Sequence, residues 1–191
     1  MTGIQIKVVD QDVNAALDRI DRVAADPSAI MAEIAGYLVT SSQRHIETES
    51  GPDGKWQRLS PRTAARRIGR RRRGTENMLR VTNRLYSSII GESSTNEAMV
   101  GTNAIQAALL HFGGPVQMPA REQDIRLGKT NRGKRFVKAS AKRGETRRVQ
   151  VGAHSITIPA RPFLYLSDED TAEILRIAED GFRREAGMEA P

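Results

Sequence analysis

The sequence contains no cysteine, few aromatic residues and no long apolar run. Without cysteine the chain can form neither disulfides nor thiolate metal sites, and it has no cysteine nucleophile. No apolar stretch is long enough for a signal peptide or a membrane span, so we expect a protein kept under cytosol-like conditions. Hydrophobic residues make up 38% of the chain and aromatic residues 4%. The expected core is therefore modest and built from Ile, Leu, Val, Ala and Met.

The residue patterns of common catalytic and cofactor sites are also missing. The three histidines, His45, His111 and His154, are scattered without the spacing of a zinc site or of a nucleophile and its base, so we interpret them as structural or surface residues. The segment "GRRRRG" lacks the ending of a phosphate-binding loop, and no carboxylate pair suggests glycoside hydrolysis. The sequence therefore predicts no enzyme, no cofactor and no metal.

Charge is distributed unevenly along the chain, whose formal net charge is +7. Residues 1–60 hold 6 basic and 9 acidic side chains, residues 61–166 hold 21 and 6, and residues 167–191 hold 3 and 8. A strongly basic middle suggests a polyanionic partner, either nucleic acid or an acidic protein surface. The simpler alternative is a set of solvated side chains on loops.

The first third predicts two helices after a short strand. Residues 3–9, "GIQIKVV", alternate apolar and polar side chains as a strand does. Apolar residues then recur at helical spacing from Asp12 to the "ADP" sequence, and a second helix begins with Pro27 in its first turn. The glycines and prolines of residues 48–60 demand a loop, in which the single tryptophan, Trp56, is predicted to be buried.

Further along the chain, the patterns alternate between hairpins and short helices. Residues 91–102 predict a hairpin in which residues 98–100 pair back near residues 88–90. A compact apolar helix over residues 105–112 is closed by Gly113 and Gly114. The segment 121–148 has 11 basic and 3 acidic residues, and its short alternating runs predict a long hairpin.

The segment "IPARPFLYLSDED" at Ile158–Asp170 changes from extended chain to helix. Two prolines keep its first half out of helical angles. Ser167 has the position of an N-cap residue with an acid three residues later, and the following amphipathic pattern predicts a helix extending to about Glu185. The face of this helix that points away from the core is expected to be acidic.

Together these patterns predict one α+β domain over residues 1–191. It would consist of a small antiparallel sheet packed by two or three amphipathic helices, with basic loop or hairpin extensions at about residues 61–77 and 115–157. Residues 62–73 hold seven arginines and no acid, and Gly69 and Gly74 interrupt any helix that begins at Pro61, so these arginines are expected on a mobile loop. The candidate contacts for a partner or for DNA are Arg66, Arg67, Arg70, Arg71, Arg72, Arg73, Arg132, Lys134 and Arg135.

Five short segments, taken in order, resemble the virion morphogenesis (tail completion) family of tailed bacteriophages. They are "GPDGKWQRLSPRT" at Gly51–Thr63, "MLRVTNRLYSSI" at Met78–Ile89, "MVGTN" at Met99–Asn103, "HFGG" at His111–Gly114 and "IPARPFLYLSDED" at Ile158–Asp170. The chain departs from the family pattern just before Phe112. Where the family has a Tyr-Ala pair and a histidine four residues after the tyrosine, this chain has Gln106, Ala107 and Leu110, and its histidine comes one residue later.

The resemblance implies a structural protein of the virion neck or upper tail that acts in tail completion and head–tail joining. It implies a homo-oligomeric ring, expected to be six-fold, that meets portal or adaptor, tail terminator or tail tube proteins and packaged DNA, without a membrane. A non-sequence-specific nucleic-acid-binding protein is the alternative. Phe163 and its neighbours could meet either the chain's own core or a neighbouring subunit. The motif residues given structural or interface roles are Trp56, Gly101, Phe112, Gly113, Arg161, Pro162 and Phe163.

Overall fold

A computed structural model describes residues 11–68, 77–130, 133–137, 144–185 and 187. The chain divides into two compact units, the first formed by residues 1–112 together with 160–191 and the second by residues 113–159. The described residues contain six helices and nine short strands, and every strand pair is antiparallel. The predicted α+β class is therefore confirmed. The strand predicted over residues 3–9 lies outside the described residues.

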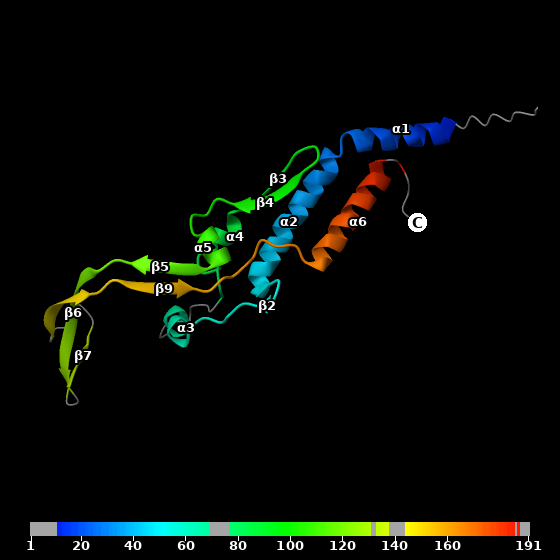
Figure 1. Cartoon of the computed structure of the whole chain (residues 1–191). Coiled ribbons are helices and arrows are strands. Elements are labelled where there is room, and N and C mark those ends of the chain that lie inside the picture. Colours follow the sequence, from blue (N-terminus) through cyan, green and yellow to red (C-terminus); the bar gives the residue numbers. More distant parts are fainter. Residues whose placement is uncertain (1–10, 69–76, 131–132, 138–143, 186, 188–191) are drawn as a thin grey trace, which may run out of the picture. The chain divides into compact units, whose positions relative to one another are not determined.

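Three helices form one half of the first unit: α1 (Gln11–Ala25), α2 (Ser28–Thr48) and α6 (Asp168–Glu185). Helices α2 and α6 run side by side (Figure 1). Ile30, Ile34 and Leu38 of α2 pack against apolar residues of α6 and α1. The two N-terminal helices and the end of α6 near Glu185 are confirmed, although Pro27 is the N-cap residue of α2 rather than a residue of its first turn.

A hairpin of β3 (Ile89–Ser93) and β4 (Ala98–Thr102) covers part of α2. The hairpin itself was predicted, but its predicted register was wrong, because Ala98 pairs with Ser93. Only four residues connect the strands, and so short a turn forces the ends nearest to it to pair. Helix and hairpin approach closely at Gly91, where an added Cβ would lie 2.8 Å from the carbonyl oxygen of Ala35.

Short elements complete the first unit around a second core cluster. They are β1 (Ser50–Gly51), β2 (Gly54–Lys55), α3 (Pro61–Ile68), α4 (Arg84–Ser87) and α5 (Ala107–Phe112). Helix α3 carries Arg62, Arg66 and Arg67, so the loop predicted for the arginines of residues 62–73 is wrong for these three, because Pro61 begins a helix of eight residues before the first glycine. Gly69 and the arginines after it lie outside the described residues. The buried members of this cluster are Ile46, Trp56, Met78, Leu85, Ile89, Ala107 and Phe163.

The second unit, which we call the β ribbon, consists only of strands in its described residues. Strand β5 (Gly114–Met118) pairs with β9 (His154–Ile158). Strand β6 (Arg121–Thr130) pairs with both β7 (Gly133–Phe136) and β8 (Glu145–Val151). The long hairpin predicted for this basic segment is confirmed. No hydrophobic side chain of the described ribbon residues is fully buried.

Candidate functional site

The segment Arg161–Phe163 is held inside the first unit by bonds to its backbone. The amide of Arg161 donates to the carbonyl oxygen of Leu110 at 2.9 Å. The indole N–H of Trp56 donates to the carbonyl oxygen of Pro162 at 3.1 Å, and the side chain of Phe163 is 0% exposed. Burial of Phe163 within its own unit favours the alternative in which this segment is part of the intramolecular core. Trp56, 6% exposed, is buried as predicted.

Arg161 is a buried cation in this segment. Its Nε lies 3.3 Å from the sulfur of Met78. Burial lowers the pKa of the guanidinium, repulsion from Arg67 lowers it further, and attraction to Glu49 opposes both effects. Glu49 has left-handed backbone angles, with φ of 53°, and its carboxylate accepts the amide of Met78 at 2.6 Å. Glu49 therefore joins the end of α2 to the segment before α4.

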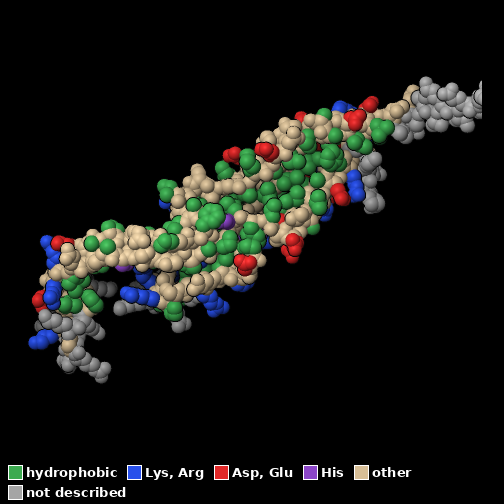
Figure 2. Space-filling model, viewed as in Figure 1, with side chains coloured by type: hydrophobic (Ala, Val, Ile, Leu, Met, Phe, Trp, Pro, Cys, Tyr) green, Lys and Arg blue, Asp and Glu red, His purple; other side chains and the backbone are tan. Residues whose placement is uncertain are grey.

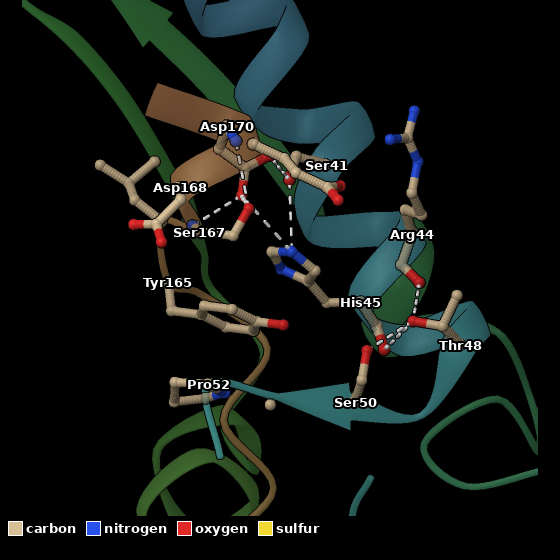
Figure 3. A pocket seen from close by; sticks show the side chains of 13 residues that line it. Ser41, Arg44, His45, Thr48, Ser50, Pro52, Tyr165, Ser167, Asp168 and Asp170 are labelled. Carbon is tan, nitrogen blue, oxygen red and sulfur yellow. Dashed lines mark hydrogen bonds and ion pairs between the residues drawn. The ribbon is translucent and has the colours of Figure 1, made fainter. Parts of the chain in front are cut away.

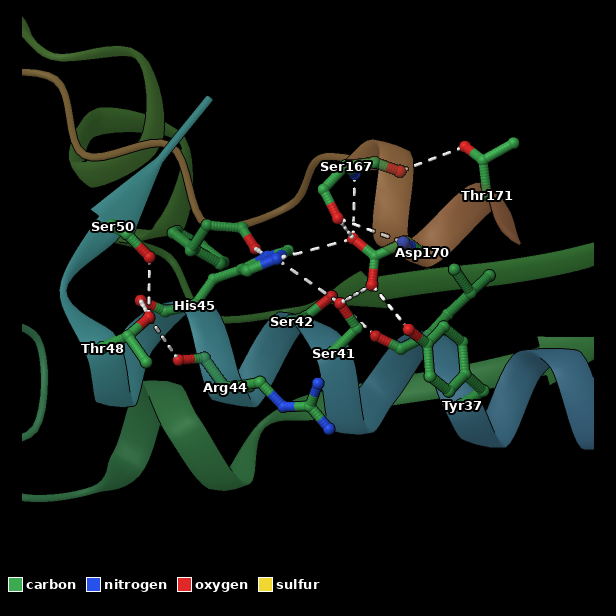
Figure 4. A network of polar contacts seen from close by, with 12 residues as sticks. Tyr37, Ser41, Ser42, Arg44, His45, Thr48, Ser50, Ser167, Asp170 and Thr171 are labelled. Carbon is green, nitrogen blue, oxygen red and sulfur yellow. Dashed lines mark hydrogen bonds and ion pairs between the residues drawn. The ribbon is translucent and has the colours of Figure 1, made fainter. Parts of the chain in front are cut away.

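A buried carboxylate, that of Asp170, joins α2 to the start of α6 (Figure 4). Its Oδ1 accepts hydrogen bonds from the hydroxyls of Tyr37, at 2.8 Å, and Ser41, at 2.5 Å. Its Oδ2 accepts from the amide and the hydroxyl of Ser167, at 2.8 and 2.7 Å, while the Asp170 amide donates back to the Ser167 hydroxyl at 3.1 Å. Ser167 and Asp170 thus form the capping pair that the sequence predicted.

These hydrogen bonds determine the charge state of the network. Burial alone would raise the pKa of Asp170, but the bonds from Ser167, Ser41 and Tyr37 outweigh it and lower the pKa to about 2. Burial and the bond to the carboxylate raise the pKa of Tyr37 to about 12. At neutral pH the network is therefore a carboxylate surrounded by neutral hydroxyl donors.

His45 lies beside this carboxylate. Its Nε2 is 3.6 Å from Asp170 Oδ2 and 3.4 Å from the Ser41 hydroxyl oxygen. Its Nδ1 is 3.2 Å from the carbonyl oxygen of Phe163, and its ring stacks on Tyr165 with centroids 3.9 Å apart. His45, predicted from the sequence to be a structural or surface residue, is buried between α2 and the segment before α6.

The grouping of Ser41, His45 and Asp170 does not have the geometry of a serine hydrolase. In such a triad the serine and the acid contact opposite nitrogens of the imidazole, so that the acid orients a ring that takes the serine proton. Here both approach Nε2, and the serine hydroxyl donates to the carboxylate. The arrangement therefore holds α2, α6 and the intervening segment together rather than activating a nucleophile.

A cleft of about 590 Å³ opens beside the network (Figure 3). Arg44, Thr48 and Ser50 line one side, and Tyr165 and Asp168 line the other. The network residues on α2 were not predicted from the sequence. Their signal was present in the chain, since Tyr37, Ser41 and His45 follow one another at four-residue steps and share one face of the helix.

The predicted contact residues are distributed over both units. Arg66, exposed, and Arg67, half-buried, lie on α3, and Lys134 and Arg135 belong to β7. The remaining predicted contacts, Arg70, Arg71, Arg72, Arg73 and Arg132, lie outside the described residues.

The glycine and aromatic motif residues also have defined positions. Gly101 lies on β4, and Phe112, 77% exposed, ends α5. Gly113 follows with φ of 67°, as expected for a glycine that closes a helix. Within the described part of the chain, no group of acidic, histidine or cysteine residues could hold a metal ion. None of the described helices is long and apolar enough to span a membrane.

Comparison with known proteins assigns the chain to a family. A model of the phage virion morphogenesis family matches residues 8–183. The chain belongs to this family. It is also 30% identical over 173 residues to the Mu-like prophage FluMu G protein 2 of Haemophilus influenzae, an alignment that covers 91% of each chain. No solved structure matches the chain.

Proposed function

We propose that this protein is a structural component of the virion neck or upper tail that completes the tail and joins it to the head. It acts there as a homo-oligomeric ring, with portal or adaptor, tail terminator or tail tube proteins as neighbours, after assembly in the host cytoplasm. The observation that carries the proposal is membership of the phage virion morphogenesis family, whose model matches nearly the whole chain.

The side chains on the surface support a role in protein contacts. The polar groups around Asp170 are bonded to one another inside the first unit, so they are committed to holding the fold. In contrast, the large apolar side chains of Ile105, Phe112 and Phe136 are well exposed to solvent. Aromatic side chains such as those of Phe112 and Phe136 are enriched at the centres of protein interfaces.

Removing the protein from an assembling phage tests this proposal. Lysates in which its gene is interrupted should contain filled heads and separate tails, or tails of abnormal length, when viewed by electron microscopy. A plasmid copy of the gene should restore joined particles. Normal infectious particles that lack the protein would refute the proposal.

Non-specific DNA binding is the second candidate function, because residues 61–166 hold 21 basic and only 6 acidic side chains. Phosphate binding has a characteristic salt dependence, with a log–log slope of about −0.9 for each phosphate neutralised on duplex DNA. We expect the arginines to meet an acidic protein surface instead, because arginines that grip DNA would hinder its passage.

A variant with Arg70–Arg73 replaced by serine separates the two functions. It should fold normally and enter particles less often than the unchanged protein. If this variant assembles normally while only the unchanged protein binds duplex DNA with the stated slope, DNA binding is the correct function.

A further inference from the structure

The β3–β4 hairpin has two unlike faces. Its inner face packs on α2 through Ile89 and Val100, which belong to the core clusters. Its outer face presents Ile90 and Met99, which are 50% and 52% exposed. A cleft of about 310 Å³ lies on this hairpin and includes both side chains and Gly101. About half of each of these apolar side chains remains accessible in the described part of the first unit.

Gly101 is not explained by the fold of its own unit. It lacks the positive φ that favours glycine, and a Cβ added to it would meet nothing within 4 Å. Glycine inside a strand weakens the strand and often marks a place where another backbone or a ligand comes close. Gly91, on the inner face of the same hairpin, is the contrasting case, because a Cβ there would strike α2.

The hairpin is acidic as well as apolar. Residues 89–106 contain no lysine or arginine and two acids, Glu92 and Glu97. Both glutamates are exposed. Successive side chains of a strand point to opposite faces, so Glu92 lies on the same outer face as Ile90, while Gly91 lies on the inner face. In the space-filling view, acidic and apolar side chains lie over this hairpin (Figure 2). Its natural partner is therefore an apolar surface that carries basic side chains.

One face of the β ribbon is largely apolar and carries Arg121 and Arg147 together with one acid, Glu145, which pairs with Leu127. Ile125 pairs with Arg147, Gln123 with Val149 and Arg121 with Val151, so these side chains share a face of the β6–β8 pair. Leu127 pairs with Phe136, which extends the same face onto β7, and Phe136 is 74% exposed. The apolar residues of this face are Ile125, Leu127, Phe136, Val149 and Val151.

The opposite face of the ribbon is polar and partly neutralised. Arg148 lies 3.3 Å from the carboxylate of Asp124 and 3.7 Å from that of Glu122. An isolated two-stranded hairpin is only marginally stable, and the apolar face of the ribbon is stabilised further when it packs on another surface. Nucleic acid would satisfy the arginines of the ribbon but would leave its apolar side chains in water, so a protein surface is the better match.

We propose that the outer face of the β3–β4 hairpin in one copy binds the apolar face of the β ribbon of a second copy. The absence of a side chain at Gly101 leaves room for the ribbon's large apolar side chains, of which Phe136 is the most exposed. Glu92 and Glu97 then face Arg121 and Arg147. This inference rests on the proposed ring, because a contact between two unlike patches repeats from copy to copy and forms a ring when the rotation between copies closes.

Crosslinking tests the contact directly, because the chain has no cysteine of its own. One preparation of the full chain carries Met99→Cys, and a second, tagged preparation carries Phe136→Cys. After the two are mixed and treated with a short bis-maleimide, we expect a crosslinked dimer that contains both chains. The matched control replaces Phe136→Cys with Gln150→Cys, which lies on the polar face of the same ribbon and should give no such dimer.

Other crosslinking results would overturn the proposal. A dimer of two Met99→Cys chains would mean that the hairpins face one another. A third preparation carries Met99→Cys and Phe136→Cys in the same chain. If its two cysteines crosslink within the chain and no crosslink forms between chains, the ribbon packs on its own hairpin. Equal crosslinking of Phe136→Cys and Gln150→Cys would mean that the contact is unspecific, and no mixed dimer at all would mean that it is absent.

Gly101→Val supplies an independent measurement. It should leave the thermal unfolding temperature unchanged or raised, since valine favours strands, yet abolish the mixed dimer because the side chain fills the cleft. Glu92→Lys in the Met99→Cys chain should also abolish the dimer, and Arg147→Glu in the Phe136→Cys chain should restore it. Full dimer formation by Gly101→Val would refute the inference.

The outcome for this contact is separable from the proposed function. If interrupting the gene still leaves heads and tails unjoined while Met99 and Phe136 never crosslink, only the contact is wrong. If particles form normally without the protein, the proposed function is wrong whatever the crosslinking result.

Discussion

Replacing Asp170 by asparagine should strongly destabilise the first unit. Asparagine has nearly the same shape, but only one of its two terminal atoms accepts hydrogen bonds. The Oδ1 bonds from Tyr37 and Ser41 can persist, whereas an amide NH₂ in place of Oδ2 would meet the amide N–H of Ser167. Hydrogen bonds to a charged group contribute about 1.5–3 kcal/mol each. Losing the two at Oδ2 and weakening the others should cost about 3–5 kcal/mol, a large share of a typical domain's stability.

The same carboxylate predicts how stability depends on pH. Its pKa is lowered from 3.8 to about 2 in the folded protein, and each unit corresponds to about 1.4 kcal/mol, so ionised Asp170 contributes about 2.5 kcal/mol. Because the folded pKa is the lower one, this contribution is fully present above the unfolded pKa, near pH 4. It is lost as the pH falls from there toward 2. Asparagine cannot titrate, so the variant should lack this part of the acid destabilisation.

Urea unfolding followed by circular dichroism at several pH values between 7 and 2 measures both effects. The difference in unfolding free energy between the natural protein and Asp170→Asn should be largest at neutral pH and shrink by about 2 kcal/mol by pH 2. The control is Asp168→Asn, which removes an exposed acid from the same helix end and should cost no more than about 1 kcal/mol. Equal pH dependence of the natural protein and Asp170→Asn would refute the reasoning.

Three further predictions concern buried positions. Trp56→Ala should cost about 3–5 kcal/mol in urea unfolding, and Trp56→Phe should cost less. Phe163→Ala should cost a similar amount and unfold the chain rather than merely prevent its assembly, whereas Leu166→Ala, at an exposed position, should leave unfolding unchanged. Gly181→Ala should destabilise by about 1–3 kcal/mol, because the new Cβ would lie 2.7 Å from a side-chain carbon of α2. Gly36→Ala, in open space on α2, should instead stabilise by up to about 1 kcal/mol in the same assay.

The features predicted correctly from sequence are those that depend on neighbouring residues. The capping pair Ser167 and Asp170 is three residues apart, and the glycine that ends α5 acts on the turn just before it. Such local rules hold whatever the rest of the chain does. The hairpin at β3–β4 was found for the same reason, while its register was missed because it depends on which residues form the turn.

The missed features join residues distant in sequence. The acid that caps α6 was identified, yet its bonds to Ser41 and Tyr37 cross 129 and 133 positions, and no local pattern specifies them. Trp56 was correctly expected to be buried, but its partner, the carbonyl of Pro162, is 106 positions away. A residue's burial follows from its own chemistry, whereas its partners follow from the packing of whole elements.

The two units differ in what they need from a partner. The first unit buries Phe163, Ile30 and Ile46 completely and satisfies its central carboxylate internally, so its fold is self-sufficient. The β ribbon buries no hydrophobic side chain completely among its described residues, so its apolar face, and Phe136 above all, gains burial when it meets another surface. Under the contact proposed above, that gain in burial comes with assembly. Gly101 lies on the other side of that contact, and a Cβ added to it meets nothing within 4 Å of its own chain. Gly101→Val should therefore alter assembly while leaving the stability of the isolated chain intact.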